Sequence, residues 1–104
     1  MKRSMQIKAM ASEVRMSVLR YLANPQEHFG HQWSANPAEF GVCMTLIAEA
    51  VNISQPTASR HLDILKQAGF IIVRKHQKWS YCKRDEAVIQ DYLAWLQQHL
   101  SPPA

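Results

Sequence analysis

The sequence predicts a mainly α-helical fold that carries one small β-hairpin. Apolar residues recur at helical spacing along most of the chain, and two β-prone runs, 70–73 and 79–82, flank a polar tip at residues 75–78. A chain of 104 residues is long enough for one domain with its own core. Because no long linker or repeat interrupts it, we expect residues 1–104 to form a single domain.

Composition excludes several classes of protein. No apolar run approaches the roughly 18 residues that span a bilayer, and the N-terminus lacks the apolar core of a signal peptide. We therefore expect a soluble, cytoplasmic protein. Cys43 and Cys82 lie far apart without CxxC spacing, which predicts free thiols and neither a disulfide framework nor a zinc knuckle.

The first expected helical region covers residues 4–23, either as one helix or as two with a bend near residues 11–13. It is followed by Asn24-Pro25, and proline disfavours helix in the residue before it. Its apolar stripe has helical spacing and consists of Met10, Val14, Val18 and Leu22.

Residues 26–42 are the least regular part of the sequence, because proline and glycine interrupt them repeatedly. A loop of this length inside a compact domain is usually functional or mobile. Its aromatic residues either pack it back onto the core, which we favour, or line a pocket for an inducer. The aromatic and histidine residues are His28, Phe29, His31, Trp33 and Phe40.

Two consecutive helices are expected next, at residues 43–51 and from about 55 to 68. Ser54 can cap the second helix, Pro56 is tolerated in its first turn, and Gly69 can end it in a left-handed conformation. The gap of about three residues is too short for an antiparallel hairpin and is typical of a helix-turn-helix. Because a hairpin follows, the order of elements is that of a winged helix-turn-helix.

The second of these helices is expected to have one buried and one exposed face. On a helical wheel the apolar arc contains Ala58, Leu62, Leu65 and Gly69. The opposite arc contains Gln55, Pro56, Ser59, Arg60 and Asp63. Small hydrogen-bonding side chains beside one guanidinium suit phosphates and base edges in a DNA major groove.

Positive charge is concentrated in two segments, although the net charge is only +4. Residues 1–23 carry five lysines and arginines against Glu13, and residues 70–84 carry five against no carboxylate. This distribution is expected if those segments meet a polyanion; a solvated surface is the alternative. The two strands of the hairpin are each expected to have one core face and one outer face. In the first strand Ile71 and Val73 alternate with Ile72 and Arg74. In the second strand Trp79 and Tyr81 alternate with Ser80 and Cys82.

A final helix is expected after Asp85, which can cap it. Its apolar residues recur at helical spacing and are Ile89, Tyr92, Leu93, Leu96 and Leu100. A stripe this strong on a terminal helix favours half of a dimer contact over packing on the chain's own core.

The chain resembles the ArsR-type family of bacterial winged helix-turn-helix repressors. The resemblance rests on residues 54–62, 65–71 and 74–81, which read SQPTASRHL, LKQAGFI and RKHQKWSY. It implies a homodimer joined by its first and last helices, two recognition helices in successive major grooves of an inverted-repeat operator, and wings on flanking DNA. It also implies an autoregulating repressor that an effector releases from DNA.

The effector sites of the family are incomplete in this sequence. Arsenic-sensing relatives carry a Glu-Leu-Cys-Val-Cys-Asp-Leu-Cys motif, and the corresponding residues 41–48 read GVCMTLIA, so only Cys43 matches. Zinc-binding relatives pair ligands on the last helices, whereas Asp91 and His99 are more than two turns apart. We therefore predict no metal and no cofactor. Two alternatives stay open: a metal site from His28, His31 and Cys43, and a thiol switch between Cys43 and Cys82.

The leading hypothesis is thus a sequence-specific transcriptional regulator that binds double-stranded DNA. An alternative is a winged helix that binds another protein and has only weak, salt-insensitive affinity for DNA. An enzyme is not predicted, because no catalytic triad, phosphate-binding glycine loop or paired carboxylate is present. The residues expected to contact DNA are Ser54, Gln55, Thr57, Ser59, Arg60, His61, Arg74, Lys75 and Lys78.

Overall fold

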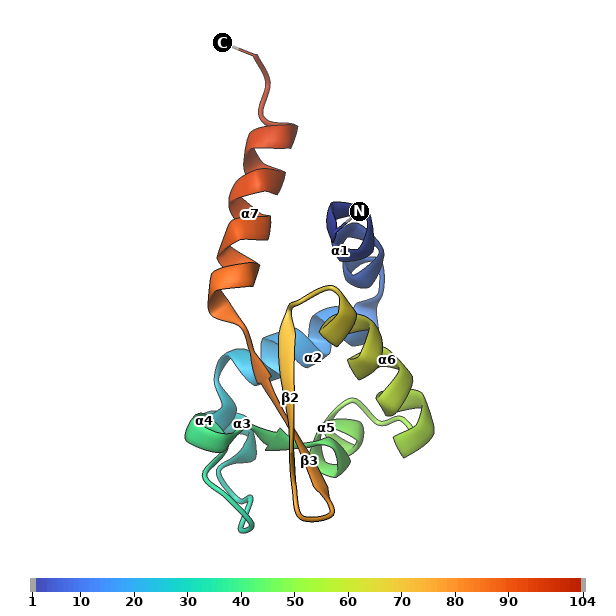
Figure 1. The fold of residues 1–104 in the computed structure, drawn as a ribbon, viewed down its shortest axis with the longest axis vertical. Coiled ribbons are helices and arrows are strands. Elements are labelled where there is room, and N and C mark those ends of the chain that lie inside the picture. Colours follow the sequence, from blue (N-terminus) through green and yellow to red (C-terminus); the bar gives the residue numbers. More distant parts are fainter. Residues whose placement is uncertain (1, 104) are drawn as a thin grey trace.

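The computed structural model describes residues 2–103 and confirms the mainly helical fold class with a small antiparallel sheet. These residues form seven helices and three strands (Figure 1). In chain order the elements are α1 (Lys2–Met10), α2 (Glu13–Ala23), α3 (Pro25–Phe29), α4 (Pro37–Phe40), β1 (Val42–Cys43), α5 (Met44–Ala50), α6 (Gln55–Gln67), β2 (Ile71–His76), β3 (Trp79–Arg84) and α7 (Glu86–Leu100). Within residues 2–103 no helix is both long and apolar enough to cross a membrane.

The first helical region is two helices rather than one. Ser12 separates them, and its hydroxyl oxygen accepts a hydrogen bond from the backbone N–H of Arg15 at 3.2 Å. A serine at this position satisfies an N–H group that would otherwise lack a partner in the first turn of α2. The chain therefore bends near residues 11–13, where the sequence analysis considered a bend. As a result α1 crosses towards the end of α6.

The helix-turn-helix forms as predicted, with one shift at its start. The first helix, α5, begins at Met44, because Cys43 belongs to β1. Asn52 takes a left-handed conformation (φ +57°) in the turn, a conformation that asparagine tolerates better than most residues. Gly69 (φ +86°) ends α6, where the N–H of Phe70 donates to the carbonyl of Leu65 at 3.0 Å, as in a Schellman motif.

Two predictions about residues 26–42 and the sheet are corrected. The segment is not a simple loop, because α3 and α4 form within it, each with proline in its first turn. The sheet has three strands in the order β1-β3-β2, because β1 pairs antiparallel with β3 and places Val42 opposite Cys82. Figure 1 shows α3, α4 and their connection at the sheet end of the molecule, away from α1.

The expected alternation of β3 also fails, since Tyr81 and Cys82 are both buried. The outer face of the strand is covered by the segment that precedes β1. The Phe40 ring lies 4.8 Å from the Tyr81 ring, and the Tyr81 hydroxyl donates to the Ser34 hydroxyl oxygen at 2.9 Å. Both faces of β3 are therefore enclosed, so adjacent residues can both be buried.

The apolar stripe of α7 divides into two halves. Ile89 and Tyr92 are buried and pack on the core of the chain, whereas Leu93 and Leu100 are exposed. Figure 1 shows the second half of α7 extending beyond the rest of the fold on the side of α1. Packing on the chain's own core therefore accounts for only the first half of the stripe.

The hairpin turn leads to a prediction about stability. His76 pairs with Trp79 across a two-residue turn, in which Gln77 has a positive φ of +57°. A left-handed conformation costs an ordinary residue about 1 kcal/mol that glycine does not lose. We expect Gln77→Gly to raise the free energy of unfolding by up to about 1 kcal/mol in a urea titration. Lys78→Gly is the matched control, and an equal effect of both changes would contradict this explanation.

Candidate nucleic-acid interface

One face of α6 is exposed and polar, as the helical wheel predicts. Ala58, Leu62 and Leu65 are buried against the core. Between residues 55 and 63 the exposed residues are Gln55, Pro56, Thr57, Ser59, Arg60 and Asp63. The burial of the apolar face fixes the rotation of α6 about its own axis, so the polar face points away from the protein.

The N-terminus of α6 is ordered by one side chain. The Ser54 hydroxyl oxygen accepts from the backbone N–H of Thr57 at 3.3 Å, and the Ser54 hydroxyl donates to Thr57 Oγ1 at 2.9 Å. Backbone N–H groups at the start of a helix and the helix dipole favour an anion. The Thr57 hydroxyl still has its own proton to donate, so this end of the helix can hydrogen-bond a phosphate.

A groove of about 460 Å³ separates α6 from the wing, the hairpin formed by β2 and β3. Ser59, Arg60 and Lys75 line it together, which brings predicted residues from both elements to one surface. Lys66 also lines it and was missed by the sequence reasoning. Its spacing could have revealed it, because Lys66 lies two helical turns beyond Ser59 on the same face.

Adjacent residues of β2 point to opposite sides of the wing. Lys75 lines the groove beside α6. Arg74 lies on the other side, where its guanidinium carbon is 4.5 Å from the centre of the Phe40 ring. Lys78 sits in the exposed turn, with Nζ 5.6 Å from the Trp79 ring. The structure thus brings Lys75 close to Arg60 and separates Arg74 from both.

His61 differs from its neighbours on α6 because it is partly buried against the first two helices. Arg15 Nη1 lies 3.0 Å from His61 Nδ1, so the arginine donates and the neutral imidazole accepts. Two further donors of Arg15 bind the carbonyls of Ala9 at 2.7 Å and Lys8 at 3.0 Å, at the end of α1. Arg15 therefore connects α1, α2 and α6 and is not a free surface cation.

Two other cations of the basic segments 1–23 and 70–84 are paired with carboxylates. Arg84 Nε lies 2.8 Å from a carboxylate oxygen of Glu86, and Arg84 Nη1 donates to the carbonyl of Leu19. Arg3 Nη1 lies 3.0 Å from the carboxylate of Asp91. The positive charge available to a polyanion is thus smaller than the sequence count indicates, and much of it lies on α6 and the wing.

The two alternative effector sites fare differently, because the metal site finds no support in the geometry whereas the two cysteines lie on adjacent strands, with Val42 opposite Cys82. Across residues 2–103, no three His, Cys, Asp or Glu side chains converge as a metal site would require. His28 instead packs edge-on against the Tyr21 ring at 5.0 Å. Burial, and secondarily Cys43, raises the pKa of Cys82 to about 12, so the reactive thiolate is scarce near neutral pH.

His61 also leads to a prediction about pH. Burial lowers the pKa of His61 below 6.5, and the charge of Arg15 lowers it further. Because the folded pKa is the lower one, the stabilisation is fully present above about pH 6.5 and is lost as the pH falls through the folded pKa. We expect the melting temperature of the wild type to fall more than that of His61→Gln between about pH 7 and pH 5. Equal slopes in thermal denaturation would contradict this.

Comparison with known proteins agrees with this geometry. A sequence model described as "Bacterial regulatory protein, arsR family" matches residues 43–73. The uncharacterized HTH-type transcriptional regulator YbzH of Bacillus subtilis is 37% identical over 79% of this chain and 82% of its own length. The transcriptional repressor SdpR of the same bacterium is 42% identical over 48% of this chain and 56% of its own length.

A solved structure shares the fold. It is the solution structure of a homodimeric winged helix-turn-helix DNA-binding domain from Mycobacterium bovis, described as a possible ArsR-family transcriptional regulator. It superposes with a TM-score of 0.67 at 21% identity and covers 98% of this chain and 88% of the other. With the match to residues 43–73 and the similarity to YbzH, the chain belongs to the ArsR family of DNA-binding winged helix-turn-helix transcriptional regulators.

Proposed function

We propose that this regulator is a homodimeric repressor that binds an inverted-repeat operator, with α6 in the major groove and the wing on flanking DNA. The observation that carries the proposal is the exposed polar face of α6, which begins at a capped N-terminus and shares a groove with Lys75 of the wing. Major-groove readers use this arrangement of a helix start near phosphates and longer side chains near base edges.

Different side chains have different proposed roles. Gln55 and Arg60 are long enough to read base edges, and a guanidinium is the commonest specific partner of guanine. Ser54, Thr57 and Ser59 are suited to phosphates near the start of the helix. We assign His61 a positioning role, since its ring nitrogen is engaged by Arg15.

The wing supplies contacts to the DNA backbone. Lys75 faces the groove beside α6, and Lys78 is exposed in the turn, so both can reach phosphates. Arg74 can reach flanking DNA only from the Phe40 side of the wing. Contacts of this kind add affinity for any sequence and position the reading helix.

A dimer is proposed through α1 and the second half of α7. Arg3 joins the two helices, through its ion pair with Asp91 and by lying 5.0 Å from the Trp95 ring. Exposed apolar side chains on the same two helices are Met5, Ile7, Leu93 and Leu100. Two-fold symmetry through this surface would place two copies of α6 about 34 Å apart, one turn of DNA. The repressor assignment is supported by the similarity to SdpR.

The first test separates base reading from phosphate binding. The preferred duplex is first selected from random DNA, and affinities are then measured by fluorescence anisotropy. We expect Arg60→Ala to weaken binding to the selected operator by about 1–3 kcal/mol and to relax its sequence preference.

Lys78→Ala is the matched control, because it removes a positive charge from the wing. It should weaken binding to all duplexes alike and reduce the slope of log K against log salt by about one. If Arg60→Ala binds the operator as tightly as the parent, the proposed placement of α6 in the major groove is wrong. Weak, salt-insensitive binding of the parent itself would favour a protein-interaction role.

The second test concerns the dimer. Leu93→Asp places a charge on the exposed apolar stripe of α7, and desolvating that charge in an interface is costly. We expect this variant to sediment as a monomer, whereas Met16→Asp, at an exposed apolar position on α2, should sediment like the parent. A monomeric parent, or a dimeric Leu93→Asp, would contradict the proposed interface.

A further inference from the structure

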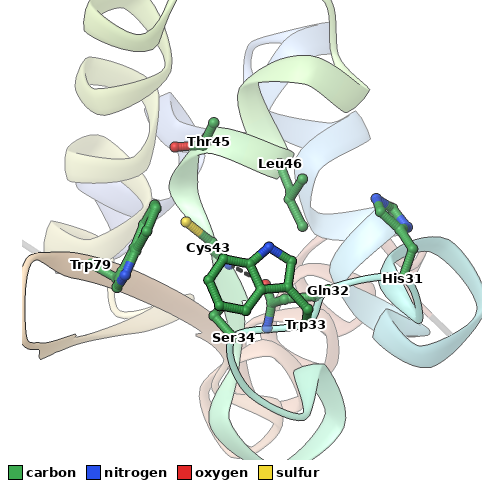
Figure 2. A pocket seen from close by; sticks show the side chains of 8 residues that line it. All are labelled: His31, Gln32, Trp33, Ser34, Cys43, Thr45, Leu46 and Trp79. Atoms are coloured by element: carbon green, nitrogen blue, oxygen red, sulfur yellow. Dashed lines mark hydrogen bonds between the residues drawn. The ribbon is translucent and has the colours of Figure 1, made fainter.

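A second concave site lies next to the proposed DNA interface. It is a pocket of about 180 Å³ between the α3–α4 connection, the start of α5 and the base of the wing (Figure 2). Its walls come from three segments that are far apart in the sequence. The lining residues used below are Gln32, Trp33, Ser34, Thr45, Leu46 and Trp79.

Two indole rings form much of the pocket wall. Figure 2 shows Trp33 lying across the pocket, Trp79 at its wing side and Leu46 above Trp33 in this view. Trp33 is 87% exposed, although an indole is among the side chains that gain most from burial. A ligand that covers this ring would remove a large apolar surface from water, at about 25 cal/mol per Å².

The lining has no carboxylate, ammonium or guanidinium group. A charged ligand would lose hydration on entering and would find no permanently charged side chain in the lining to pair with, so the pocket favours a neutral compound. Outside the lining, Lys78 Nζ lies 5.6 Å from the centre of the Trp79 ring and would repel a positively charged ligand.

The lining has few polar groups, and they differ in how much hydrogen-bonding capacity they have left for a ligand. The amide of Gln32 is fully used: Oε1 accepts from the N–H of Cys43 at 2.8 Å, and Nε2 donates to the carbonyls of Ala35 and Gly41. Gln32 is therefore a rigid part of the wall. Ser34 accepts from the Tyr81 hydroxyl and keeps its own proton to donate, and Thr45 adds a second hydroxyl to the lining.

These features define the ligand. An apolar cavity of about 150 Å³ holds a benzene molecule, so about 180 Å³ accepts one ring with a small substituent. We propose that this pocket binds a neutral, single-ring aromatic compound carrying one hydroxyl or carbonyl group, and that this compound is an effector of DNA binding. The ring would lie against Trp33 and Trp79, and its polar substituent would lie near Ser34 or Thr45.

The position of the pocket explains how such a compound would act. Thr45 and Leu46 belong to α5, the first helix of the helix-turn-helix, and Trp79 begins β3 of the wing. An occupant contacts both elements and would change the orientation of the wing relative to α6. This regulatory part rests on the proposed function, whereas binding to the pocket does not.

Binding can be tested on the full chain without DNA. The chain has three tryptophans, and their indole N–H signals form three peaks in a proton–nitrogen correlation spectrum. Benzyl alcohol is the probe, and benzoate and benzylamine are the matched charged probes. We expect saturable shifts of the Trp33 and Trp79 peaks with benzyl alcohol, little change at Trp95, and at least tenfold weaker binding of both charged probes.

A variant locates the site independently. Trp33→Ala should weaken benzyl alcohol binding about tenfold with little effect on folding, because the side chain is so exposed. Met16→Ala, which truncates an exposed apolar residue elsewhere, should bind like the parent. The proposed site is overturned if no saturable shifts are seen or if the Trp95 peak shifts as much as the others. It is also overturned if benzoate binds more tightly than benzyl alcohol, or if Trp33→Ala binds benzyl alcohol with unchanged affinity.

The effector role has a separate readout. Operator affinity is measured with and without saturating benzyl alcohol, in the parent and in Trp33→Ala. We expect a change of at least about fivefold in the parent, the lower range of allosteric coupling, and a much smaller change in the variant at the same concentration. An unchanged parent overturns the effector role alone. If the parent protein binds no duplex, both the proposed function and the effector role are overturned. The indole N–H shifts then still show whether the pocket binds the compound.

Discussion

The orientation of α6 about its own axis is the constraint on which the candidate interface depends. Ala58, Leu62 and Leu65 are buried, and burying each leucine contributes about 1.5–3 kcal/mol, so a rotated helix would lose several kcal/mol. Arg15 adds a directional contact, because its guanidinium donates to His61 as well as to the carbonyls at the end of α1. Apolar packing and one charged hydrogen-bond donor thus act together to keep the polar face of α6 outward.

Local sequence signals predicted this part of the molecule well. The cap at Ser54, the left-handed stop at Gly69 and the arcs of α6 each depend on residues within a few positions of one another. Asp85 likewise caps α7 through the N–H of Val88. Caps and helical spacing are sufficient to predict an element whose backbone hydrogen bonds lie within the element itself. For this reason the helix-turn-helix and the last helix could be predicted from the sequence.

Features that depend on distant partners could not be predicted in the same way. β1 has only two residues, too few for a periodic pattern, and exists because Val42 and Cys43 pair with β3. Phe40 packs on Tyr81 and beneath Arg74, so an arginine expected on the outer face of the wing has an aromatic neighbour from another segment. Lys66 is a different case, because its helical spacing from Ser59 was visible in the sequence and only the wing on the far side of the groove was not.

The short strand β1 has a consequence for how the protein behaves at high concentration. A β-strand with an unpaired edge invites strands from other molecules, and β3 would have such an edge if Val42 and Cys43 did not pair with it. The longer free edge of the sheet belongs to β2, and it carries Arg74 and Lys75, whose like charges oppose edge-to-edge association. The segment before α5 therefore covers the part of the β3 edge formed by Tyr81 and Cys82, where a strand of another molecule could otherwise pair.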